Sequence, residues 1–78
     1  MKAVFVGGKY DGLQCEVSEV WKFASGKTPN YSGVRAAGRC VPCAKLDEQP
    51  KVSGYCGPML DGGMLRYETW EVYEMLSR

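Results

Sequence analysis

The chain has 78 residues, of which four are cysteine and none is histidine, and its formal net charge is +1. Domains usually contain roughly 100–150 residues, so we expect a single domain over residues 1–78 with one small hydrophobic core. The absence of histidine removes the commonest general base from any catalytic arrangement. The apolar start is too short for a signal peptide and no run suits a membrane span, which predicts a cytoplasmic protein.

The first elements are predicted to form a β-hairpin. Residues 2–6 are apolar and rich in β-branched and aromatic side chains, which favours a buried strand. Asp11-Gly12 is a tight-turn signal, and residues 13–17 then alternate between apolar and polar side chains. A helix over residues 13–24 is the alternative, because apolar residues also recur there at helical spacing.

The middle of the chain is predicted to be irregular. Residues 25–38 contain three glycines, a proline and serines without sustained periodicity, which is typical of a loop. Residues 40–45 are expected to form a short strand or a knuckle, and residues 46–50 a turn.

The last third is predicted to return to regular structure. The residue types of segment 64–76 favour a strand, while the spacing of its apolar residues leaves a terminal helix as the alternative. We therefore predict a β-rich α+β domain: a small antiparallel sheet with a long central glycine-rich loop, in which the first strand pairs with residues 13–17 and 64–76. The predicted core consists of Val4, Val6, Leu13, Val17, Trp70 and Val72.

Four cysteines raise the question of a metal. Cys40 and Cys43 form a C-x-x-C pair, and Cys15 and Cys56 complete a possible set of four. Without histidine, a structural zinc site could only be an all-cysteine tetrahedron, which would stabilise the fold without catalysing a reaction. Because a second C-x-x-C pair is lacking, free or buried thiols are favoured over zinc, and disulfides are the third alternative.

Two motifs that accompany catalysis are present only in part. The C-x-x-C pair of redox proteins should follow a βα unit and begin a helix, whereas here it follows a polar loop. Gly26-Lys27-Thr28 matches the end of a phosphate-binding loop, but Trp21 stands where that loop needs its first glycine. We therefore expect a protein that is not an enzyme.

Basic residues gather in the centre of the chain. Between Lys22 and Lys45 there are five cations and no carboxylate. This segment predicts either a solvated loop or a site for a phosphate-bearing ligand, nucleic acid or a signalling nucleotide, held by Lys22, Lys27, Arg35 and Arg39. A steep fall of affinity with salt would identify the second alternative.

The two ends of the chain carry a resemblance. These segments are residues 3–12, with Gly7-Gly8 and Asp11-Gly12, and residues 65–73, with Arg66, Tyr67 and Tyr73. They resemble small uncharacterised bacteriophage and prophage proteins, which begin with a strand, a Gly-Gly-x-x-Asp-Gly turn and a second strand, and end in a Tyr- and Arg-rich strand. The resemblance implies a non-enzymatic inhibitor or adaptor that binds a host or defence protein in the host cytoplasm. Candidate interface anchors are Tyr31, Tyr55, Tyr67 and Trp21, although Trp21 is expected to be buried. A homodimer is a further alternative.

Overall fold

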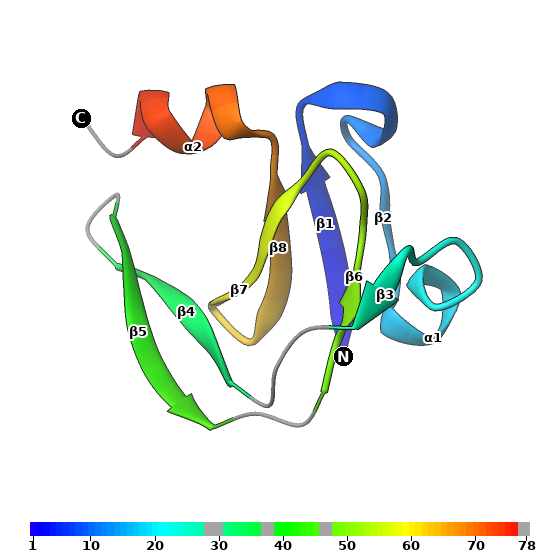
Figure 1. Ribbon diagram of the computed structural model, residues 1–78, viewed down its shortest axis with the longest axis horizontal. Helices are drawn as coiled ribbons and strands as arrows, with labels where there is room; N and C mark the ends of the chain where they lie inside the picture. The colour runs from blue at the N-terminus through cyan, green and yellow to red at the C-terminus, as the bar shows by residue number, and fades with distance from the viewer. Residues whose placement is uncertain (28–30, 37–38, 46–47, 77–78) are drawn as a thin grey trace.

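The computed structural model describes residues 1–27, 31–36, 39–45 and 48–76, with the backbone alone for 31–36 and 39–45. The fold is α+β and rich in strands, as predicted (Figure 1). In chain order the elements are β1 (Lys2–Val6), the 3₁₀ turn η1 (Gly8–Tyr10), β2 (Gln14–Glu16), α1 (Val17–Val20), β3 (Gly26–Lys27), β4 (Tyr31–Ala36), β5 (Arg39–Lys45), β6 (Pro50–Lys51), β7 (Cys56–Asp61), β8 (Met64–Glu68) and α2 (Trp70–Leu76). No helix of the described residues is long and apolar enough to cross a membrane.

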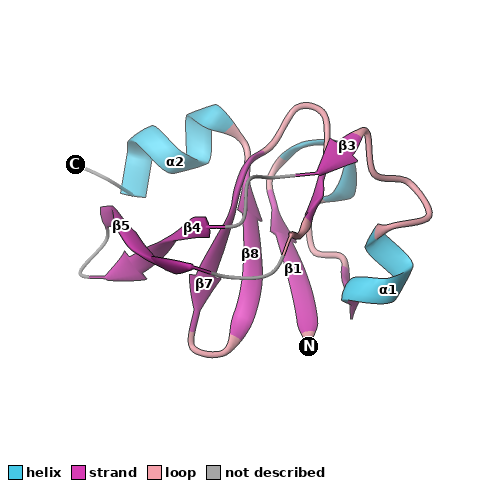
Figure 2. Cartoon of the chain, turned by 60° about the horizontal axis from the view of Figure 1, so that its bottom comes forward, coloured by secondary structure: helices cyan, strands magenta, loops and turns pink. Residues whose placement is uncertain are grey.

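Most strands belong to one bent sheet. Its six strands follow the order β2-β1-β8-β7-β4-β5, and β3 pairs with β6 in a separate two-stranded sheet. The two helices lie at opposite ends of the molecule (Figure 2), α1 beside β2 and α2 beyond the end of β8 (Figure 1). The strand order confirms that β1 pairs with the segment after Asp11-Gly12 and with the start of segment 64–76.

Glycine turns close two of the hairpins in the large sheet. In the β1–β2 connection, the Asp11 carboxylate accepts a hydrogen bond from the Gly7 amide at 2.7 Å, which holds the predicted turn. In the β7–β8 hairpin, Gly62 and Gly63 have φ values of 58° and 83° between the paired residues Asp61 and Met64. Two consecutive positive φ angles are the mark of a type I′ turn, whose twist matches that of the flanking strands.

Two features of the predicted sheet need correction. The sheet is mixed, because β1 and β8 run parallel, as do β4 and β7. A turn motif specifies only the antiparallel pair that it connects, whereas β1 and β8 come from opposite ends of the chain. The long central loop is not confirmed either, since β3 and β4 lie within residues 25–38. Ladder hydrogen bonds to β5 and β7 outweigh the weak strand propensity of glycine and serine there.

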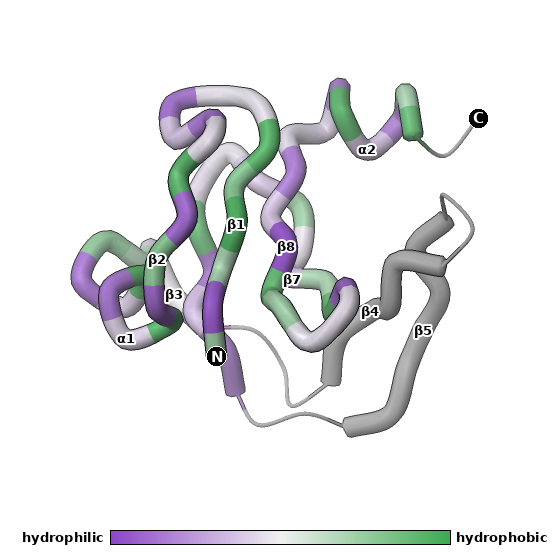
Figure 3. Tube along the Cα trace, turned by 180° about the vertical axis from the view of Figure 1, so that it is seen from behind, coloured by the Kyte–Doolittle hydropathy of each residue, from purple (hydrophilic) through white to green (hydrophobic). Residues whose placement is uncertain are grey.

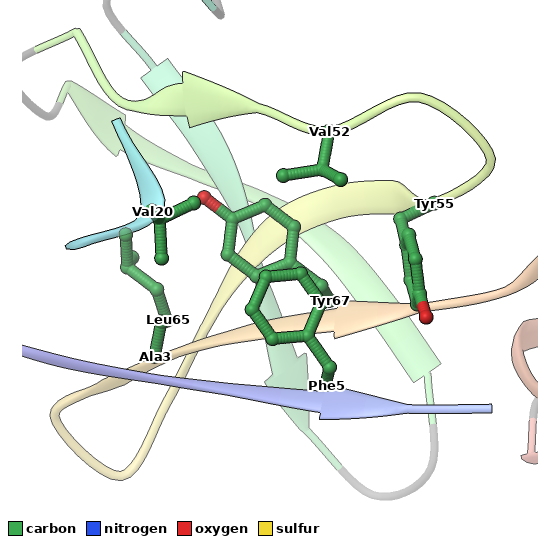
Figure 4. Packing of buried hydrophobic residues seen from close by; sticks show 7 residues of the cluster. All are labelled: Ala3, Phe5, Val20, Val52, Tyr55, Leu65 and Tyr67. Carbon is green, nitrogen blue, oxygen red and sulfur yellow. The ribbon is translucent and has the colours of Figure 1, made fainter. Parts of the chain in front are cut away.

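An aromatic core fills one face of the sheet. The buried cluster comprises Ala3, Phe5, Val20, Val52, Tyr55, Leu65 and Tyr67 (Figure 4). The Phe5 and Tyr67 rings are stacked, with centroids 4.6 Å apart, and the Tyr55 ring meets Phe5 edge-on at 5.2 Å. Tyr67 is fully buried, and its hydroxyl donates a hydrogen bond to the Pro50 carbonyl. That bond ties the small sheet to the large one.

The predicted core contains residues from the wrong face of β1. Ala3 and Phe5 are buried in the cluster, whereas Val4 and Val6 on the opposite face are only half-buried. Every position from 3 to 6 is apolar, so the sequence does not reveal which face meets the core. Leu13 and Val17 are half-buried and pack against the cluster. Val72 is half-buried as well, and Trp70 is 60% exposed.

Both segments with two alternatives contain a strand and a helix in succession. Within residues 13–24, β2 is followed at once by α1, and within residues 64–76, β8 is followed by α2. Each alternative was therefore right for part of its segment. Secondary-structure propensity summed over a whole segment cannot show at which residue a strand ends and a helix begins.

Candidate protein-interaction surface

Two predicted interface anchors belong to the core. Tyr55 is 8% exposed and Tyr67 is fully buried, so neither ring is available to a partner. The Tyr55 hydroxyl donates to the Gly7 carbonyl at 2.6 Å and accepts from the Tyr10 amide at 2.8 Å. Tyr55 therefore holds the turn after β1 in place. The side chain of Tyr31, in β4, lies outside the described residues.

The predicted basic site is only partly described. Lys22 pairs with Glu19 at 3.0 Å and Lys27 pairs with Glu48 at 3.2 Å. Both pairs are exposed, so each contributes roughly 0–1 kcal/mol to stability, but each places a carboxylate beside the cation that a phosphate would have to meet. The side chains of Arg35 and Arg39 lie outside the described residues.

The four cysteines are spread over three strands. Cys15 lies in β2 and Cys56 in β7, with β1 and β8 between them. At the usual strand spacing, this separates them by roughly 14 Å along the sheet. Cys40 and Cys43 lie on β5, which is the strand alternative for residues 40–45, and three residues of extended chain span roughly 10 Å. The structure thus does not bring Cys15 and Cys56 together.

Cys15 packs as a small apolar residue against the core cluster. Its burial raises the pKa of its thiol, and the carboxylates of Glu19 and Glu16 raise it further. A raised pKa keeps the thiol protonated at neutral pH and lowers its reactivity. Among the residues with described side chains, no group of three or more His, Cys, Asp or Glu could hold a metal.

An unpredicted ion-pair cluster connects β7 and β8. The Arg66 Nε donates to the fully buried Glu68 carboxylate at 2.6 Å, and Arg66 also reaches Asp61 at 3.5 Å. Arg66 and Glu68 occupy the sheet face opposite Leu65 and Tyr67, since side chains alternate along β8. The cluster therefore neutralises a buried charge within the fold.

The largest exposed apolar side chains are concentrated on α2. Trp70 is 60% exposed, Met75 62% and Leu76 38%, and no residue of α2 is buried. The Trp70 ring stacks on the Tyr73 ring with centroids 5.4 Å apart and an interplanar angle of 17°. Figure 3 shows hydrophobic positions on α2 although the helix lies at the margin of the molecule. We call Trp70, Glu71, Tyr73, Glu74, Met75 and Leu76 the α2 surface.

Contacts at its first turn fix α2 to the sheet. The Thr69 amide donates to the Val6 carbonyl at 3.2 Å, and the Tyr73 amide donates to the Thr69 carbonyl at 2.9 Å. Thr69 also caps the helix, because its hydroxyl accepts from the Val72 amide at 3.4 Å. A Cβ on Gly7 would lie 2.9 Å from a Val72 methyl, so Val72 packs closely on the β1 turn. These contacts leave the side of α2 that carries Trp70 exposed to solvent.

Two carboxylates accompany the aromatic pair. Glu71 and Glu74 are exposed, and neither takes part in any of the ion pairs of the described residues. Residues three and four apart are neighbours on a helix, so Glu74 lies beside Trp70. No cation occurs between Trp70 and Leu76. The α2 surface is therefore apolar and acidic.

A second exposed tryptophan lies at the other end of the molecule. Trp21, which directly follows α1, is 45% exposed, so its expected burial is not observed. Its neighbour Lys22 is already paired with Glu19. Trp21 is thus an exposed tryptophan like Trp70, but it lies beside a lysine that is already ion-paired.

Comparisons with protein-family models, curated proteins and solved structures find no match for this chain.

Proposed function

We propose that this chain is a small non-enzymatic binding protein that contacts a protein partner through the α2 surface. The observation that carries the proposal is the stacked Trp70–Tyr73 pair, which is exposed on a helix without a buried residue. Trp and Tyr are enriched among the residues that dominate binding energy in interfaces, because they bring large area at low entropic cost. Met75 and Leu76 add exposed apolar area to the same helix.

The class of partner follows from the resemblance of both chain ends to small phage proteins. Such a protein would act as an inhibitor or adaptor on a host or defence protein in the host cytoplasm. This hypothesis takes its binding residues from α2 in place of the predicted tyrosines Tyr55 and Tyr67. It is preferred to the phosphate-ligand alternative because Lys22 and Lys27 already face carboxylates.

The test compares tryptophan variants at the two ends of the molecule. Full-length wild type, Trp70→Ala and Trp21→Ala are used to capture partners from host lysate, and the recovered protein is purified for calorimetric titration. Trp70→Ala should weaken binding by about 30-fold, the effect of losing roughly 2 kcal/mol at a binding hot spot. Trp21→Ala should change it less than about threefold, because the α1 end lies outside the interface.

Unchanged circular dichroism must show that α2 persists in the Trp70→Ala variant, and Trp70→Phe provides a milder replacement. Equal affinity of wild type and Trp70→Ala for the purified partner would refute the proposal. Tight binding of a small metabolite without any protein partner would refute it as well.

A further inference from the structure

We infer that the α2 surface recognises an arginine-bearing segment of its partner, with a guanidinium stacked on Trp70 and paired with a neighbouring carboxylate. This inference deepens the proposed function and rests on it. It depends on three features: an indole with an open face, two carboxylates that form no ion pair with any described residue, and the absence of a cation between Trp70 and Leu76.

The indole of Trp70 has one free face. Tyr73 stacks on the ring at 5.4 Å, yet the residue remains 60% exposed. A ring that is covered on one side and largely exposed leaves its other face to solvent. Tryptophan is the best aromatic acceptor for a cation placed over its ring. The chain already contains such a contact, since the Lys9 ammonium lies 5.5 Å from the Tyr10 ring centroid.

The carboxylates determine the sign of the partner's charge. Glu71 and Glu74 repel phosphate groups and anionic lipid headgroups, so nucleic acid and an anionic membrane are disfavoured as occupants of this surface. A cation brought over Trp70 comes within reach of Glu74, which follows it by one helical turn. Charge complementarity of this kind gives specificity and suppresses wrong partners.

The geometry favours arginine over lysine. A guanidinium is planar, so it stacks flat on an indole while its edge donates hydrogen bonds to a carboxylate. An ammonium is a compact and strongly hydrated charge, so it cannot stack flat on the indole while it donates hydrogen bonds to the carboxylate. The overall charge of +1 also means that the whole protein does not attract polycations, so binding must come from the local surface.

The experiment titrates the full-length protein with capped tetra-arginine, tetra-lysine and tetra-glutamate peptides. Amide and indole signals are followed by heteronuclear NMR, in which the two tryptophans give separate indole N–H peaks. Tetra-arginine should shift the Trp70 indole while the Trp21 indole stays in place. Tetra-lysine should bind about two- to fivefold more weakly, because an ammonium cannot stack flat on the indole while it bonds a carboxylate. Tetra-glutamate should not bind.

The double variant Glu71→Gln/Glu74→Gln isolates the charge while preserving side-chain shape. It should lose most of the tetra-arginine response, with the remaining spectrum unchanged. Equal shifts of both indoles, or a tetra-lysine response equal to that of tetra-arginine, would overturn the inference. Concentration-dependent dimerisation that Trp70→Ala abolishes would also overturn it, because a second copy would then occupy the surface.

The two proposals can fail separately. If the purified partner binds the glutamine double variant as tightly as wild type but does not bind Trp70→Ala, the α2 surface is a protein interface without arginine recognition. If neither change affects the partner, the proposed function itself fails.

Discussion

Tyr67→Phe removes a single oxygen from the centre of the molecule. The ring and its stacking on Phe5 at 4.6 Å remain, so the substitution opens almost no cavity. It does remove the hydrogen bond to the Pro50 carbonyl, and Pro50 is itself fully buried. A buried carbonyl left without a donor costs about 1–3 kcal/mol.

That cost is large for a small domain. At roughly 0.05–0.15 kcal/mol per residue, a chain of this length has about 4–12 kcal/mol of stability. Urea unfolding followed by far-ultraviolet circular dichroism should therefore show a clear fall in the midpoint without a change in slope.

Tyr10→Phe is the matched control. The Tyr10 ring belongs to the same aromatic cluster and lies 5.6 Å from Phe5, but its hydroxyl is not hydrogen-bonded to any described residue. Its loss should cost less than about 0.5 kcal/mol. If the two phenylalanine variants unfold at the same urea concentration, the bond to Pro50 does not hold the two sheets together.

Three further outcomes follow. Burial, with a smaller contribution from the Cys15 thiol, raises the pKa of Tyr67 in the folded protein. The protonated Tyr67 hydroxyl therefore contributes its full stability below the unfolded pKa of about 10, and this contribution is lost as the pH rises above that value. In urea titrations, wild type should lose stability in alkali more steeply than Tyr67→Phe. Gly8→Ala should cost about 2–3 kcal/mol, because its Cβ would lie 2.8 Å from a threonine methyl, whereas Gly12→Ala, also at positive φ but with open space, should cost about 1 kcal/mol by thermal melting. Glu68→Ala should cost about 2 kcal/mol by removing the buried partner of a guanidinium, while Glu19→Ala, in an exposed pair, should cost less than about 1 kcal/mol in the same melts.

The sequence predicts those features that depend on neighbouring residues. Asp11-Gly12 predicts the turn that leads into residues 13–17, and residues 2–6 form the expected strand. The parallel pairing of β1 with β8 has no such local signal, because the two strands come from opposite ends of the chain. Nor does an all-apolar run such as residues 3–6 show which of its faces is buried.

The candidate surface was missed for a related reason. Trp70, Val72 and Tyr73 have high strand propensity, so the residue types favour a strand with Trp70 in the core over the alternative of a terminal helix. The Thr69 cap is the signal that could have revealed the helix, since a threonine ahead of an acidic first turn is typical of a helix start. Solvent exposure of Trp70 depends on how little of the sheet α2 covers, and no sequence pattern reports this.

Site-specific photo-cross-linking in the native host tests the central claim most directly. A photoreactive phenylalanine analogue is placed at position 70 in one full-length variant and at position 21 in another, and irradiated cells are examined for covalent adducts. The account predicts a discrete adduct with one host protein from position 70 and none from position 21. An adduct from position 21 alone would contradict the account, because it would place the partner at the α1 end of the molecule.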